Sequence, residues 1–194
     1  MAKAKPITGL DAQAPTGKNA RIIAKVRFEE MYEWDRYADN PYHVRELHNL
    51  RIAAKRLRYT LEIFEEVLPE ACKPIVKELE QIQEELGTLH DNDVKIALLR
   101  LCLGSQDSGV AYEEALVGAK QQYSKKQFIL APELVADLLD PAVALSAEER
   151  YGLEQMLLKQ QQDREDQFTT FRQHWHQLQA RDFRREILDI LDES

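Results

Sequence analysis

The chain has 194 residues, 44% of them hydrophobic, which is enough to bury one sizeable core. Its 26 Lys and Arg residues are outnumbered by 34 Asp and Glu residues, for a formal net charge of −8. This balance excludes a general basic coat for nucleic acid or an anionic membrane, so we expect any anion-binding site to be local.

The N-terminal residues lack the apolar core of a secretory signal, and no later run approaches the about 18 apolar residues that a membrane-spanning helix requires. We therefore expect a cytoplasmic protein with no membrane partner. Cys72 and Cys102 stand in no zinc-motif spacing and are predicted to be reduced packing residues.

The chain begins with a polar segment, residues 1–17, which we predict to be a disordered or loosely attached tail. A first helix is predicted from about Lys18 to Asp39. The "NPY" that follows ends it, because Asn40 can cap the next helix and Pro41 suits a first helical turn.

The next two helices are predicted at about 42–68 and 70–103, since each carries an apolar stripe with helical spacing. Gly87 interrupts the second of them and costs about 1 kcal/mol relative to Ala in a helix interior. The stripe of the 42–68 helix consists of Leu47, Leu50, Ala54, Leu57, Leu61, Phe64 and Leu68. The stripe of the 70–103 helix consists of Ile75, Leu79, Ile82, Leu86 and Leu89.

The rest of the chain is also predicted to be helical. A loop at 104–109 precedes a short helix near 110–126, an ambiguous "QFILA" and a helical turn before Pro141. Ser146 and Glu149 form a capping box for a helix to about Gln179, with an apolar seam of Phe168, Phe171, Trp175 and Leu178, and "DFRREILDIL" closes the chain. We therefore predict an all-α bundle of long antiparallel helices, with residues 18–194 as a single domain.

The stretch "HNLRIAAKRLRY", residues 48–59, concentrates positive charge beside the first stripe. His48, Arg51, Lys55 and Arg58, here called the basic row, each follow a stripe residue by one position. At 1.5 Å per residue the row is about 15 Å long and borders the core.

The basic row is unusual because like charges at i and i+4 repel. From His43 to Tyr59 there are five Lys or Arg residues, Arg45 and Arg56 among them, against one acid, Glu46. A solvated face paired with glutamates of other helices is one explanation, and a bound anion is the other. If an anion binds, Arg45 joins the row and Arg56 points less directly at the same site.

The segment "LGTLHDND" of the following helix carries polar groups near the end of its stripe. If the seam of Leu86 and Leu89 continues in register, Asp93 is the next inward position, where a carboxylate requires a partner such as an arginine of the basic row. We assign Asp93, together with Asp91, an orienting role. His90 is either a hydrogen-bonded core residue or a donor to an anion.

The combination of "HNLRIAAKRLRYTLEIF" and "LGTLHDNDV" resembles the CHAD family, the conserved histidine α-helical domain, best over residues 42–96. The resemblance implies a helical bundle around a basic groove or pore that binds inorganic polyphosphate, with His48, Arg51, Lys55 and Arg58 matching the family motif. The family carries two such halves, whereas only one clear copy is present here. Either a degenerate second half or a homodimer would complete the site.

Physical chemistry favours the same ligand. A phosphate chain is a line of negative charges, which a linear array of Arg and Lys matches better than a compact pocket does. Arg21 and Lys25 of the first helix either add to this channel or belong to a solvated face. Arg172 and His176 either supply an opposite wall or are ordinary surface residues.

Two alternatives come from other classes of protein. His48, His90, Asp91 and a later aspartate such as Asp163 imitate the ligands of helical metal-dependent phosphohydrolases, although the flanking cations would repel a metal. A helical adaptor that binds a partner helix is the other. We expect polyphosphate binding without catalysis, cofactor, metal or specific nucleic acid, in a cytoplasmic protein associated with polyphosphate granules.

Overall fold

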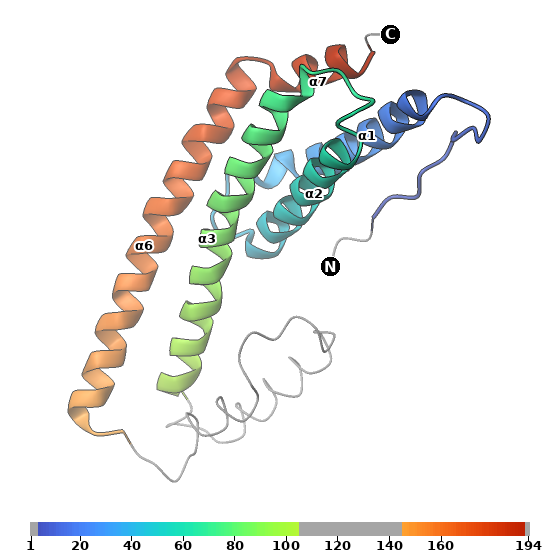
Figure 1. Cartoon of the computed structure of the whole chain (residues 1–194). Coiled ribbons are helices and arrows are strands. Elements are labelled where there is room, and N and C mark those ends of the chain that lie inside the picture. Colours follow the sequence, from blue (N-terminus) through green and yellow to red (C-terminus); the bar gives the residue numbers. More distant parts are fainter. Residues whose placement is uncertain (1–3, 105–144, 193–194) are drawn as a thin grey trace. The chain divides into compact units, whose positions relative to one another are not determined.

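The computed structural model describes residues 4–104 and 145–192 (Figure 1). Throughout these two ranges every regular element is a helix, which confirms the all-α prediction. The elements are α1 (Thr16–Tyr32), the 3₁₀ helix η1 (Asp35–Tyr37), α2 (Val44–Ile63), α3 (Cys72–Gly104), α6 (Ala147–Ala180) and α7 (Phe183–Asp192). None of the described helices is long and apolar enough to cross a membrane.

The chain divides into two compact units, one of residues 1–91 and 164–194 and one of residues 92–163. The basic row and the contacts described below for it belong to the first unit. The predicted single domain over residues 18–194 stays a prediction. The predictions for the loop, the short helix, "QFILA" and the turn before Pro141 fall in residues 105–144, outside the described ranges.

The core of the first unit is built around the predicted stripes. Leu50, Ala54 and Leu57 of α2 are completely buried, and the stripe of α3 is buried from Ile75 to Leu89. Helix α1 packs against α2 and α7 (Figure 1). It contributes Ala20, Ala24, Phe28 and Met31 to the same cluster.

Helix α1 ends at Tyr32, seven residues before the predicted end at Asp39. The cause is tertiary, because the Asp35 carboxylate accepts hydrogen bonds from Trp175 Nε1 at 2.7 Å and Gln179 Nε2 at 2.8 Å on α6. These contacts hold residues 33–43 as a connection with its own 3₁₀ turn. Regular helix there would carry this carboxylate away from its donors.

The start of α2 also differs from the prediction. Asn40 does not cap the helix, since its Oδ1 accepts from the Tyr42 amide at 2.9 Å, and the residue before the helix is His43. Pro41 lies in the connecting turn, and its carbonyl accepts from Arg164 of α6 at 2.6 Å. The polar "NPY" segment therefore forms a turn that is held by a hydrogen bond from α6.

Helix α6 begins and packs as predicted. The Ser146 amide donates to Glu149 at 2.8 Å and the Glu149 amide donates to Ser146 Oγ at 3.2 Å, which is the reciprocal capping box. Its aromatic seam is buried, with Phe171 at 0% and Trp175 at 2% exposure.

A histidine joins α6 to α3. His174 Nδ1 lies 2.9 Å from Glu85 Oε2, and its Nε2 lies 3.0 Å from Glu78 Oε2. Arg181 contacts Glu78 at 2.9 Å, so α6 and α3 run antiparallel here (Figure 1). The hydrogen bond with Glu85 raises the pKa of His174 above its usual 6.5, the bond with Glu78 adds to this, and burial opposes both.

The His174 contact makes stability depend on pH. Only protonated imidazole donates from both nitrogens, so the folded chain binds this proton more tightly than the unfolded chain. The stabilisation is complete below pH 6.5 and is lost as pH rises through the raised pKa. Urea unfolding of the wild type and of His174→Gln should therefore differ most in acid and converge in base; a constant difference across pH would contradict this.

Candidate functional site between α2 and α3

A surface depression of about 520 Å³ lies between α2 and α3. Three cations of the basic row lie on its α2 side, and three carboxylates lie on its α3 side, so their formal charges cancel. The lining consists of Arg51, Lys55, Arg58, Tyr59, Glu80, Gln83, Glu84, Gly87, Thr88 and Asp91. The expected basic groove therefore has one basic wall and one acidic wall.

The two helices run antiparallel along this depression. Three contacts show the direction: the rings of His48 and His90, Arg51 beside Gly87, and Arg58 with Glu80. The α3 residue number falls as the α2 number rises. Because the stripe of α2 faces the core, the residues one position later reach this edge, as the sequence predicts.

Arg51 and Lys55 have no carboxylate partner in residues 4–104 and 145–192. Arg51 is half-buried, and its Nε, which is buried, makes no hydrogen bond to any described residue. Lys55 is exposed, with its Nζ 5.5 Å from the Tyr59 ring centroid. Both charges are thus available to a ligand.

Arg58 is different because carboxylates already lie beside it. Its Nη1 is 3.2 Å from Glu80 Oε1, and its Nε is 3.5 Å from Glu62 Oε1. The guanidinium carbon also lies 5.0 Å from the Tyr59 ring centroid. A ligand at this end of the row must compete with Glu80.

His48 and His90 form a ring pair at the other end of the row. Their centroids are 4.2 Å apart, and His48 Nδ1 is buried without a hydrogen bond to a described residue. Burial lowers the pKa of His48 to about 4, and electrostatic interaction with His90 and Arg51 acts in the same direction. The ring of His48 is therefore neutral at pH 7.

Arg56 does not share the site of the row. Its guanidinium forms an ion pair with Glu30 of α1, which also accepts from Arg27 at 2.6 Å. Glu30 is only 3% exposed, so the two arginines compensate a buried carboxylate. We predicted that Arg56 points less directly at the site than the basic row does, and its ion pair with Glu30 gives the reason.

The remaining predicted cations are dispersed over the first unit. Lys25 pairs with Asp192 of α7, and Arg172 contacts Asp39 at 3.0 Å, as does His176 at 2.7 Å. The hydrogen bond from Arg172 lowers the pKa of the Asp39 carboxyl, as does that from His176, against burial.

Arg21 and Arg45 also lie outside the lining of the depression. Arg21 is close enough to Cys72 to lower the pKa of that thiol, although burial has the larger effect and raises it. Arg45 is an exposed residue in the first turn of α2.

The register predicted for Asp93 is wrong by one residue. Asn92 is the buried position after Leu89, at 4% exposure, and Asp93 is partly exposed in the second unit. Buried positions on one face of a helix recur three or four residues apart, so both residue 92 and residue 93 fit the pattern. Burying the neutral amide of Asn92 costs less free energy than burying the carboxylate of Asp93. Asp91 lines the depression.

The ligand set of the hydrolase alternative is not assembled in the part of the chain that the structure describes. No group of three His, Cys, Asp or Glu side chains there is placed to hold a metal ion. His48 and His90 are adjacent, but Asp163 belongs to the second unit.

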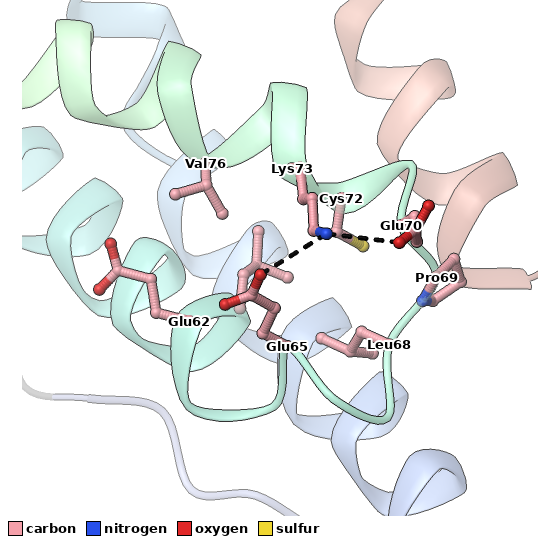
Figure 2. A pocket seen from close by; sticks show the side chains of 9 residues that line it. Glu62, Glu65, Leu68, Pro69, Glu70, Cys72, Lys73 and Val76 are labelled. Carbon is pink, nitrogen blue, oxygen red and sulfur yellow. Dashed lines mark hydrogen bonds and ion pairs between the residues drawn. The ribbon is translucent and has the colours of Figure 1, made fainter.

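A second hollow, of about 100 Å³, lies where α2 leads into α3 (Figure 2). Its rim carries Glu62, Glu65 and Glu70, and its one cation, Lys73, lies 3.8 Å from Glu65 and 3.4 Å from Glu70. Carboxylates outnumber cations there, so an anion is better matched by the depression between α2 and α3.

Comparison with protein-family models matches residues 3–100 to the CHAD domain. The chain belongs to the CHAD family. The match covers α1, α2 and nearly all of α3, and hence every residue that lines the depression. No curated protein and no solved structure matches the chain.

Several residues of this site were not predicted from the sequence. Tyr59 and Gly87 were within the quoted motifs, but their contacts with basic side chains depend on the packing of α2 on α3. Glu80 and Glu84 gave a weak signal, since residues 80, 84, 87 and 91 share one face of a helix.

The state of His48 can be measured directly. We expect its ring to titrate with a pKa of about 4, because burial and the neighbouring His90 and Arg51 side chains oppose protonation. Histidine side-chain NMR over pH 3–8 would show this, with the signal assigned by its loss in His48→Gln. His174 should titrate above 6.5 in the same spectra, and a His48 midpoint near 6.5 would contradict the described environment.

Proposed function

We propose that this CHAD protein binds inorganic polyphosphate along the basic row, without cleaving it. The observation that carries the proposal is that Arg51 and Lys55 stand in a line beside the core with no carboxylate partner in the described residues. Membership of the family agrees with an anionic phosphate ligand. We also propose that the protein is cytoplasmic and associates with polyphosphate granules.

The shape of the row suits a linear ligand. Arg51, Lys55 and Arg58 span about 10 Å along α2 at 1.5 Å per residue. Successive phosphates of a chain can engage successive cations, and each hydrogen bond to a charged group contributes about 1.5–3 kcal/mol before the cost of association. A single small anion would use only one part of the row.

The acidic wall moderates this attraction. Glu80, Glu84 and Asp91 are exposed, so water and salt screen them more strongly than they screen the partly buried guanidinium of Arg51. Their presence is consistent with a ligand that is bound reversibly. It also argues against a site for weakly charged anions, which the opposing carboxylates would repel.

His48 adds a dependence on pH. Its ring is neutral before binding because it is partly buried and lies beside His90 and Arg51, and a phosphate placed there would favour the protonated form. Binding should therefore strengthen as pH falls from 7.

Removing the three cations of the depression tests the proposal. The triple variant Arg51→Ala, Lys55→Ala and Arg58→Ala should lose retention of long-chain polyphosphate and keep its helicity, because these side chains lie at the edge of the core. Retention would be followed by a filter-binding titration at two salt concentrations. Wild-type affinity should fall steeply with salt, since several phosphates are neutralised.

Lys25→Ala is the matched control, because it removes one cation that pairs with Asp192 away from the depression. It should bind like the wild type. Undiminished binding by the triple variant would refute the site. Phosphate release by the wild type with added divalent metal would refute the proposal that the ligand is not cleaved.

Removing one acid of the opposite wall should have the reverse effect. Glu80→Gln takes away a competitor for Arg58, so polyphosphate should bind roughly 1.4- to fivefold more tightly, the range expected from the 0.2–1 kcal/mol of an exposed ion pair. Isothermal titration would measure this.

Glu62→Gln is a close control for this experiment. Glu62 also contacts Arg58, at 3.5 Å, but it does not line the depression. Its substitution should change affinity less. Equal gains in both variants, or weaker binding by Glu80→Gln, would show that the acidic wall does not compete with the ligand.

A further inference from the structure

Gly87 occupies an unfavourable place for a glycine. It lies in the middle of α3, a helix of 33 residues, where alanine would be the better helix former. Its backbone does not require a glycine, because its φ lies outside the left-handed range. Some other constraint must account for the missing side chain.

The constraint is the guanidinium of Arg51. A Cβ at position 87 would lie 3.3 Å from Arg51 Nε, 3.6 Å from Nη2 and 3.9 Å from Cζ. The first distance is shorter than ordinary van der Waals contact, and all three atoms belong to one planar group. Arg51 therefore lies against the helix backbone in the space that a side chain would fill.

These distances also give the orientation of the guanidinium. Both Nε and Nη2 are closer to the Cβ position than Cζ is, so the edge that carries these two nitrogens faces Gly87. Nε is consequently buried, without a hydrogen bond to a described residue. Nη1, on the other side of the guanidinium, is directed away from the backbone of α3.

We propose that Gly87 is a positioning residue: its missing side chain lets Arg51 lie against α3, with one guanidinium edge covered and the other presented to an anion in the depression. This inference deepens the proposed function and rests on it for the ligand. The placement of Arg51 itself does not depend on the ligand. Gly87 thereby determines how the partly buried cation of the row meets a phosphate.

A purely structural role and a positioning role predict opposite results for Gly87→Ala. If the glycine has no partner, alanine stabilises the helix and leaves binding unchanged. If it positions Arg51, alanine displaces the guanidinium and weakens binding while the protein stays folded. Affinity for long-chain polyphosphate should then fall by about tenfold, the effect of losing most of one charge-assisted hydrogen bond.

Gly152→Ala is the matched control. Gly152 also lies within a long helix, α6, but a Cβ there would meet no atom within 4 Å. This variant should melt at the same or a higher temperature than the wild type and bind polyphosphate equally well. Melting temperature and affinity would be measured together for both alanine variants.

A double-mutant cycle shows whether Gly87 acts through Arg51. In an Arg51→Ala background, Gly87→Ala should weaken the remaining affinity no further, because the group that it displaces is absent. An equal loss in both backgrounds would overturn the inference, as would wild-type affinity in Gly87→Ala.

A ligand-free measurement separates this inference from the proposed function. The Arg51 Nε–H signal in a ¹H–¹⁵N spectrum, assigned by its loss in Arg51→Lys, should shift and exchange faster with water in Gly87→Ala but not in Gly152→Ala. An unchanged signal would overturn the placement. If the signal moves but the wild type binds no polyphosphate, the proposed function fails and the positioning of Arg51 stands.

Discussion

The candidate site depends on one constraint, the burial of the apolar stripe of α2. Once Leu50, Ala54 and Leu57 are fixed in the core, the residues that follow each of them can only lie along the edge of the helix. The basic row is therefore held beside the buried core. Arg51 and Arg58 are partly buried, so they lose part of their hydration without losing access to solvent, which strengthens their interaction with an anion.

Helix α3 contributes to the site in two ways. At Gly87 a missing side chain leaves room for a guanidinium, while at Glu80, Glu84 and Asp91 carboxylates oppose the cations across the depression. The antiparallel course of the two helices sets these residues against one another.

The fold neutralises most of the other cations that might have joined the row. Glu30 compensates Arg56, Asp192 pairs with Lys25, and Asp39 lies between Arg172 and His176. Arg51 and Lys55 differ because no carboxylate of the described residues pairs with them and both line the depression. Their charges can therefore bind an anion, although the protein as a whole is acidic. The number of basic residues in the sequence does not reveal this difference.

The sequence by itself determined the helical class, the stripes of α2, α3 and α6, the capping box at Ser146, and the line of basic residues beside a core. These properties are local, because periodicity along one chain segment fixes which residues share a face of a helix. Tertiary structure alone decided the end of α1, where α6 supplies donors to Asp35, and the choice of Asn92 over Asp93 as the buried position. It also decided which cations keep a free charge, the low pKa of His48 and the role of Gly87, because each depends on side chains far apart in the sequence that only packing brings within a few ångströms.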